Sequence, residues 1–253
     1  MRVGCHALAW GAAPLAAVAR DVRDAGYEGL EVGREALADA AGTLGRAGLA
    51  LTGTYLEPSV DDPPDVVADE ARRLAGVLAD AGAAVLVLGP PMRERAPPTA
   101  ETLDAFAQRA VAASEAVAEV PGVRACVHPH YDSAVETPAD LAWFDDLTGR
   151  LPLALDTAHL RLGGFDLPGA VERFADAGRV AHVHLKDVVS PAARDEWPAA
   201  TRELGAGSVP VDPCLDVLDA AGYDGWLVVE QDRAADPAAE AARSREFLSE
   251  HGY

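Results

Sequence analysis

Short hydrophobic runs alternate along this chain with longer, alanine-rich stretches in which apolar residues recur every three or four positions. Runs of the first kind are typical of buried strands, and stretches of the second kind are typical of helices that pack on a sheet. The expected strands span residues 3–9, 29–33, 50–56, 84–89, 123–129, 153–156, 180–185 and 226–230. The expected helices lie near residues 14–25, 35–47, 64–81, 99–119, 138–148, 167–177, 212–221 and 236–250. Helix-closing glycines support these boundaries, namely Gly26, Gly48, Gly82, Gly178 and Gly222.

The regular alternation of strand and helix predicts the fold class. Strands separated by single helices are typical of parallel βαβ units, and no Pro-, Ser- or Gly-rich linker divides the chain. We therefore expect one α/β domain over residues 1–253, a single (β/α)8 TIM barrel, with a doubly wound open sheet as the alternative. Two long connections, Gly89 to Pro98 and Val188 to Pro210, follow strands, on the face where barrels carry their active-site loops.

Composition and charge narrow the range of partners. The 253 residues include 21 basic and 41 acidic side chains, which gives a formal net charge of −20. Nucleic acids and anionic membranes need clustered basic residues, so neither is an expected partner. The three cysteines form no CxxC pair, and no apolar run is long enough to span a membrane. These features predict a cytoplasmic protein.

Lysine usage is unusual. Lys186 is the only lysine of the chain, whereas every other basic residue is an arginine. An acidic surface that is nearly free of lysine suits a salt-rich, halophile-like cytoplasm, and codon bias in a GC-rich genome explains it equally well. Under either explanation, one retained lysine hints at a requirement for an amine.

Polar residues collect at the ends of the expected strands. Because these ends converge at one face of a barrel, they predict a single pocket. A lone histidine in such a place is more often a packing residue, Asp156 can simply cap a turn, and Glu230 can form a structural ion pair. Convergence of several strand ends nevertheless favours a site that binds Mn, Co, Mg or Zn. The strand-end residues are His6, Glu31, Tyr55, Glu57, His128, His130, Asp156, His159, His182, His184, Lys186, Asp187, Glu230, Gln231 and Asp232.

Several motifs carry a resemblance to a known family. They are AGYEGLEVG at 25–33, VHPH at 127–130, VETP at 135–138, LDTAHL at 155–160, AHVHLKD at 181–187 and AGYDGWLVVEQD at 221–232. In these stretches the chain resembles the sugar phosphate isomerase/epimerase superfamily of xylose isomerase-like barrels. Within that superfamily it looks most like inosose dehydratase and its relatives.

The resemblance implies a set of metal ligands and catalytic groups. Asp156, His184 and Glu230 match three of the family's metal ligands. His128 stands where many epimerases have a glutamate, so Glu136 is the expected fourth ligand. Glu230, Lys186 and His130 are the expected catalytic residues. For substrate binding we expect His159, which matches a family residue that touches substrate hydroxyls, together with His128, His6, Trp10, Glu31, Tyr55 and Arg202.

The expected function is that of a metal-dependent sugar or polyol lyase or isomerase in carbohydrate metabolism, most similar to the inosose dehydratases of inositol catabolism. A divalent metal would polarise a carbonyl and stabilise an enediolate after proton abstraction. Alternatives are a ketose isomerase or epimerase of the hydroxypyruvate isomerase or tagatose epimerase kind, an endonuclease IV-like nuclease, and a catalytically dead barrel. The chain has no GxxxxGK or GxGxxG motif, which counts against ATP and NAD. The expected partner is a small sugar or polyol, and a homo-oligomer is compatible with the sequence.

Overall fold

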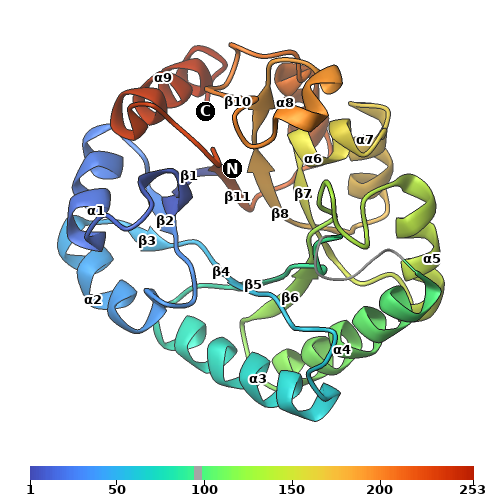
Figure 1. The fold of residues 1–253 in the computed structure, drawn as a ribbon. Helices are drawn as coiled ribbons and strands as arrows, with labels where there is room; N and C mark the ends of the chain where they lie inside the picture. The colour runs from blue at the N-terminus through green and yellow to red at the C-terminus, as the bar shows by residue number, and fades with distance from the viewer. Residues whose placement is uncertain (94–98) are drawn as a thin grey trace.

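Parallel strands form a closed ring at the centre of the molecule, and helices surround it (Figure 1). The computed structural model describes residues 1–93 and 99–253. The strand order is β3-β2-β1-β11-β8-β7-β6-β5-β4, and every pairing between these strands is parallel. The strands are β1 (Arg2–His6), β2 (Gly29–Glu31), β3 (Ala50–Leu51), β4 (Thr54–Leu56), β5 (Val85–Leu88), β6 (Arg124–Val127), β7 (Leu153–Asp156), β8 (Val180–Leu185) and β11 (Trp226–Val229).

The two ends of that strand order close the barrel. β3 and β4 are two pieces of one extended stretch, interrupted only at Thr52 and Gly53. One stretch of chain therefore pairs with β2 through its first half and with β5 through its second half, and it joins the two ends of the sheet. This arrangement confirms the expected single (β/α)8 barrel over the open doubly wound sheet.

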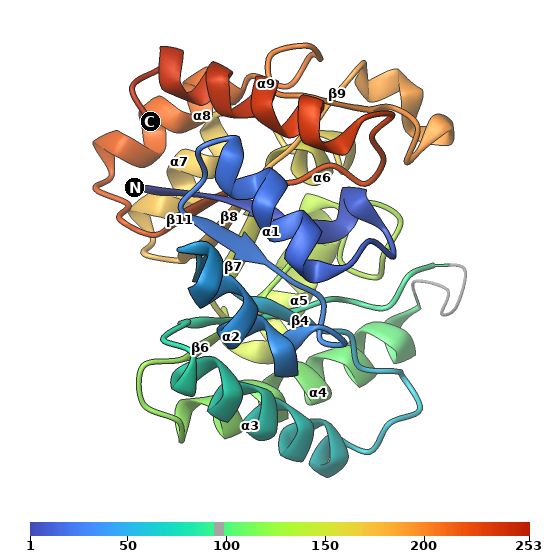
Figure 2. The ribbon, with the colours of Figure 1, turned by 90° about the vertical axis from the view of Figure 1, so that its left-hand side faces the viewer.

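The helices occupy the places that the hydrophobic pattern predicts. α1, α2 and α9 lie side by side on the outside of the barrel (Figure 2). The helices are α1 (Leu15–Asp24), α2 (Leu37–Ala47), α3 (Pro64–Asp80), α4 (Ala100–Ala118), α5 (Pro138–Thr148), α6 (Thr157–Leu162), α7 (Gly169–Asp176), α8 (Val211–Ala220) and α9 (Pro237–Glu250). The five helix-closing glycines all have positive φ angles, between 65° and 90°, as left-handed helix ends require. In the described part of the chain, no helix is long and apolar enough to cross a membrane.

Apolar packing fills both sides of the strands. Leu30, Leu86 and Leu155 belong to the large core between strands and helices, while Val87 belongs to a smaller cluster with Cys126 and Ala154. A Cβ atom at Gly29 would lie 2.6 Å from Thr52 Cγ2 and 2.7 Å from Trp226 Cη2. Glycine at position 29 therefore gives the Trp226 ring the room it needs.

Two local elements differ from the sequence-based expectation. Residues 7–10 form the 3-10 helix η1 (Ala7–Trp10) and do not continue the first strand, because the His6 side chain accepts the Leu8 N–H at 3.0 Å and caps that turn. Helix α6 directly follows β7 and was not expected. It begins there because the Asp156 carboxylate accepts the His159 N–H at 2.8 Å.

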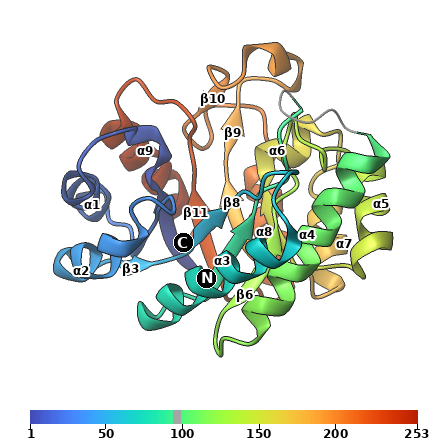
Figure 3. The same ribbon diagram turned by 60° about the horizontal axis from the view of Figure 1, so that its bottom comes forward.

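The long connection after β8 has structure of its own. β9 (Asp187–Val188) pairs with β10 (Thr201–Arg202), and the 3-10 helix η2 (Pro191–Glu196) lies between them, beyond the carboxyl end of β8 (Figure 3). The Asp187 carboxylate accepts backbone N–H groups of Gly205, Gly207 and Val209 and anchors this segment. The other expected long connection, from Gly89 to Pro98, lies within the described residues only as far as Arg93.

Candidate functional site

A cavity of about 360 Å³ opens at the carboxyl ends of the barrel strands. Its walls come from β1 and β4 and from the loops that follow β1, β2, β4, β5, β6 and β11. The lining residues include His6, Leu8, Arg34, Glu35, Tyr55, Glu57, Met92, His128, His130, Glu230 and Asp232. The strand-end residues thus meet at one face, as the barrel geometry requires.

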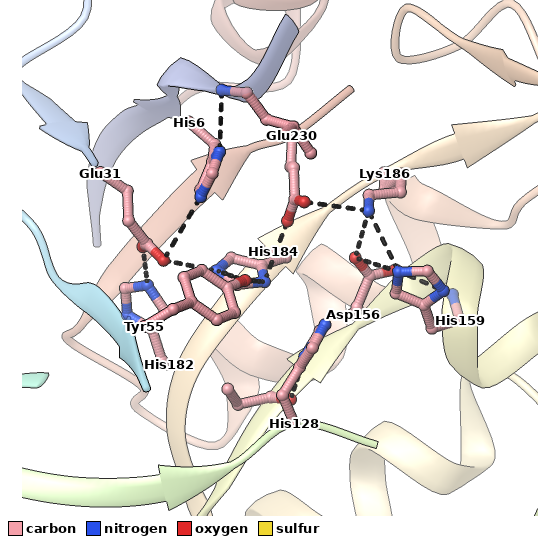
Figure 4. Close-up of polar contacts among 12 residues, drawn as sticks. His6, Glu31, Tyr55, His128, Asp156, His159, His182, His184, Lys186 and Glu230 are labelled. Atoms are coloured by element: carbon pink, nitrogen blue, oxygen red, sulfur yellow. Dashed lines mark hydrogen bonds and ion pairs between the residues drawn. The ribbon is translucent and has the colours of Figure 1, made fainter. Parts of the chain in front are cut away.

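Imidazoles and carboxylates gather beside this cavity (Figure 4). Asp156 ends β7 and lies in register with His184 of β8. His128 follows β6, and its ligand atoms lie close enough to those of Asp156 and His184 for the three side chains to share one ion. Glu230 follows β11, and its Oε2 lies 3.2 Å from His184 Nδ1. All four side chains are buried.

The ammonium group of Lys186 lies behind these residues and is fully buried. Its Nζ lies 3.3 Å from Asp156 Oδ2, 3.1 Å from Glu230 Oε1 and 3.0 Å from Asp232 Oδ2. It also donates a hydrogen bond of 3.1 Å to His159 Nε2. A buried charge requires such partners, and here one cation holds three carboxylates in place.

Burial and charge set the protonation states around Lys186. Burial alone would lower the pKa of Lys186, but Asp156, Asp232 and Glu230 outweigh it and keep the amine protonated. Burial raises the pKa of Asp232 to about 6, against the pull of Lys186. The pKa of Glu230 stays well below its usual range because Lys186 and His184 outweigh the effect of burial.

The histidines divide into two groups. Burial lowers the pKa values of His6, His128 and His159, and it lowers the pKa of His130 to about 4, so these four rings are neutral. His184 differs, because the carboxylates of Glu31 and Glu230 outweigh burial and raise its pKa to about 9. In the absence of a metal, His184 therefore carries a proton at neutral pH.

An aromatic side chain from the connection after β8 covers one side of the site. The Trp197 ring centroid lies 4.9 Å from that of His159 and 5.9 Å from that of Tyr131. Lys186 Nζ lies 5.2 Å from the Trp197 ring. Trp197 therefore shields the buried Lys186 and His159 from the solvent side.

Several residues expected in the site lie apart from it. The Glu136 carboxylate pairs with Arg93 Nη2 at 3.0 Å and with Arg194, and it is in none of the potential metal-binding groups found within residues 1–93 and 99–253. The indole of Trp10 donates to Asp21, and the Arg202 guanidinium donates to backbone carbonyls of its own segment. Neither Trp10 nor Arg202 lines the cavity.

Other residues gain importance from the structure. Asp232 lines the cavity and contacts Lys186, although the sequence offered only its spacing of two from Glu230 as a signal. Glu31, expected to bind substrate, is fully buried and does not line the cavity. It contacts His182 instead, a residue whose only signal was that it shares a strand face with His184.

A closed parallel barrel with ionisable groups at the carboxyl ends of its strands defines the class of (β/α)8 proteins that hold a site at this face. The chain belongs to the xylose isomerase-like TIM barrel family, whose model matches residues 7–251.

The proteins that match this chain in sequence align with about half of it. The inosose dehydratase of Geobacillus thermodenitrificans strain NG80-2 is 33% identical over 145 residues, which are 51% of this chain and 48% of that protein. The match therefore spans about half the length of this curated relative.

Solved structures resemble the whole chain. The probable 3-DHS dehydratase AsbF of Bacillus anthracis has a TM-score of 0.80 at 13% identity and covers 98% of this chain and 99% of its own. The IOLI protein with a bound zinc atom has a TM-score of 0.74 at 16% identity. The match covers 98% of this chain and 96% of the IOLI chain. At these identities the likeness shows the fold.

Proposed function

We propose that this chain is a divalent-metal-dependent lyase or isomerase that removes a proton next to the carbonyl of a small, uncharged sugar or polyol. The particular reaction we propose is dehydration of an inosose-like ketone, because the matching sequence relatives include inosose dehydratases. The observation that carries the proposal is the clustering of Asp156 and His184 with His128 and Glu230, the last two of which line the cavity.

The residues present fit a divalent metal. Asp156 Oδ2 and Glu230 Oε2 are buried oxygens that form no regular hydrogen bond in the described part of the chain, only ion-pair contacts with Lys186 Nζ at 3.3 Å and His184 Nδ1 at 3.2 Å. Together with His128 and His184 they offer two carboxylates and two imidazoles, a donor set that suits Zn, Mn or Co. We propose His128 as the fourth ligand in place of Glu136, because the two arginines beside Glu136 already neutralise its carboxylate. The zinc atom of the IOLI structure supports the binding of a divalent metal.

A metal in this position would polarise the substrate carbonyl and stabilise the negative charge that develops on its oxygen. The chain itself supplies the base. His130 lines the cavity, and its Nδ1–H donates to the Tyr131 carbonyl. Because the ring is neutral, Nε2 keeps its lone pair and can accept the proton next to the carbonyl. His130 is therefore the proposed base, and Glu230 is the proposed metal ligand.

Lys186 and Asp232 together supply the acid. Asp232 faces the cavity, its pKa of about 6 lets it carry a proton near neutrality, and the Lys186 ammonium lies 3.0 Å behind it. In dehydration, the electron pair of the broken C–H bond forms the C=C bond as the neighbouring C–O bond breaks. The leaving hydroxyl takes a proton from Asp232 and departs as water. Isomerisation would instead return a proton to carbon.

The charge of the cavity favours an uncharged substrate. Glu57, Glu230 and Asp232 all line it. Among the lining residues that belong to the described ranges 1–93 and 99–253, the single arginine is Arg34, which pairs with Glu35 at 3.5 Å on the exposed rim. A phosphorylated substrate would be repelled because carboxylates outnumber cations among these residues. The hydroxyl groups of a polyol can instead form hydrogen bonds with the carboxylates and imidazoles that line the cavity.

The test is proton NMR in D2O with the purified protein, Mn or Co, and a panel of inososes and ketoses. We expect metal-dependent loss of the signal next to the carbonyl, and a product spectrum that separates dehydration from isomerisation. EDTA should abolish the exchange. Bound metal without exchange on any member of the panel would contradict the proposal.

A further inference from the structure

Glu31 is a fully buried carboxylate beneath the proposed metal site. It ends β2, and His184 separates it from Glu230 (Figure 4). Glu31 Oε1 lies 3.3 Å from His184 Nε2, whereas Glu230 Oε2 lies 3.2 Å from His184 Nδ1. The two carboxylates therefore face the two opposite nitrogens of one imidazole.

Partners around Glu31 fix its charge and its position. His182 Nε2 lies 2.6 Å from Glu31 Oε2, and Thr52 Oγ1 donates to the same oxygen at 3.4 Å. His6 Nε2 lies 3.9 Å from Oε1. Burial alone would raise the pKa of Glu31, but His182 and His184 outweigh it and hold the pKa well below its usual range. These contacts hold the Glu31 carboxylate in place as a hydrogen-bond acceptor beside His184.

The geometry points to a positioning role for Glu31, and this inference rests on the proposed metal site. A histidine that binds a metal through one ring nitrogen donates the proton of its other nitrogen, and a carboxylate acceptor fixes that tautomer. We propose that Glu31 accepts the Nε2–H of His184 and thereby keeps the Nδ1 lone pair directed toward Asp156, Glu230 and His128. His182 holds Glu31 from the opposite side.

A second metal ion bound by Glu31, His182 and His184 is the competing explanation, because their ligand atoms also lie close together. Two observations favour the positioning role. His184 is common to both groups, and a neutral imidazole offers one lone pair to one metal. The 2.6 Å separation of Glu31 and His182 is that of a hydrogen bond already formed.

The first experiment uses the unmodified protein. With uniformly ¹⁵N-labelled histidine and Zn added, long-range ¹H–¹⁵N spectra report which nitrogen of His184 binds metal. We expect one Zn per chain, metal on Nδ1 and a proton on Nε2. Metal on Nε2 of His184, or metal bound to His182, would overturn the inference while leaving the proposed function intact. Failure to bind any metal would instead overturn the proposed function.

The second experiment measures Zn affinity by chelator competition in Glu31→Gln and Glu31→Leu. We expect Glu31→Leu to weaken Zn binding about 10- to 100-fold and to alter the visible spectrum of the Co form. Glu31→Gln should weaken Zn binding less, because its amide oxygen still accepts a hydrogen bond. Glu57→Gln is the matched control, since Glu57 lines the cavity at the end of the third barrel strand. Circular dichroism checks that each variant is folded. Wild-type affinity and spectrum in a folded Glu31→Leu would refute the positioning role.

Discussion

β5 and β8 occupy equivalent places in the barrel but fill its interior in opposite ways. Val85 and Val87 of β5 pack against other apolar side chains inside the ring. The inward positions of β8 and its extension carry His182, His184 and Lys186, all of them fully buried. Apolar side chains need only neighbours of suitable shape, whereas buried ionisable groups need specific partners.

This difference shows where stability and function are coupled. The inward side chains of β5 contribute free energy through packing, so they are replaceable by others of similar shape. On the β8 side, each charge is held by charges from β2, β7 and β11, so the loss of one partner leaves the others buried and unpaired. The following predictions test this comparison, beginning with the largest expected effect.

Lys186→Met removes the cation that, within residues 1–93 and 99–253, contacts Asp156, Glu230 and Asp232 together. We expect the free energy of unfolding of the metal-free protein to fall by about 3–5 kcal/mol, because buried carboxylates lose their partner. Urea unfolding in EDTA measures the loss, and added Zn should restore part of it. Arg72→Met, which breaks an exposed ion pair with Glu119, is the control and should leave the curve unchanged. An unchanged curve for Lys186→Met would contradict the coupling.

His130→Gln removes the proposed base but none of the proposed metal ligands. The rate of substrate proton exchange in D2O should fall about 10²- to 10⁴-fold, the usual contribution of a general base. Zn affinity should stay at the wild-type value. His251→Gln is the matched control, because His251 lies exposed just after α9. Equal exchange rates for both variants would assign the base to another residue.

Val87→Thr tests the apolar packing of β5 inside the barrel. Thr has the shape of Val, so it introduces a hydroxyl among Val85, Cys126 and Ala154 without creating a cavity. We expect the free energy of unfolding to fall by about 1–3 kcal/mol with no change in Zn affinity. Val66→Thr, at an exposed position, should change neither quantity. Weaker Zn binding by Val87→Thr would show that the two sides of the barrel are not independent.

The same contrast explains how much the sequence could predict. Strand alternation is a local rule with a period of two, so the sequence alone is enough to assign Asp156, His184 and Glu230 to strand ends. Barrel closure then brings such ends together, whichever strands they belong to. The fold and the gathering of polar strand ends at one face followed from those two rules, whereas the choice of Asp156, His184 and Glu230 as metal ligands came from the family resemblance.

Loop residues obey no local rule of that kind. The direction of Glu136 depends on Arg93 and Arg194, which come from connections after two other barrel strands. Trp10 turns toward Asp21 because η1 replaces the expected end of β1. The role of Glu31 depends on contacts across the barrel with β8, and these contacts exist only after the ring has closed.

The pH dependence of stability is the smallest expected effect, and it tests the protonation of His184. The pKa of His184 is about 9 in the metal-free native protein, against an ordinary value of 6.5 in the unfolded chain. Between these values the native state binds a proton that the unfolded state does not, so stability falls as pH rises. From pH 7 to 8 the loss is at most about 1.4 kcal/mol, or about 2–6 °C in Tm.

Metal should reverse the sign of this dependence. The four histidines with lowered pKa values are neutral in the native state above pH 7, but a minor fraction of each is still protonated in the unfolded chain. Together they therefore add a smaller change of opposite sign between pH 7 and 8. With Zn in fixed excess, a rise in pH removes the proton that competes for His184, so binding tightens and Tm should rise. Thermal melts at pH 7 and 8, with EDTA or Zn, measure both slopes, and His184→Asn should lose the downward one. Parallel slopes in EDTA and in Zn would show that the metal does not displace a proton from His184, and would place it elsewhere in the barrel.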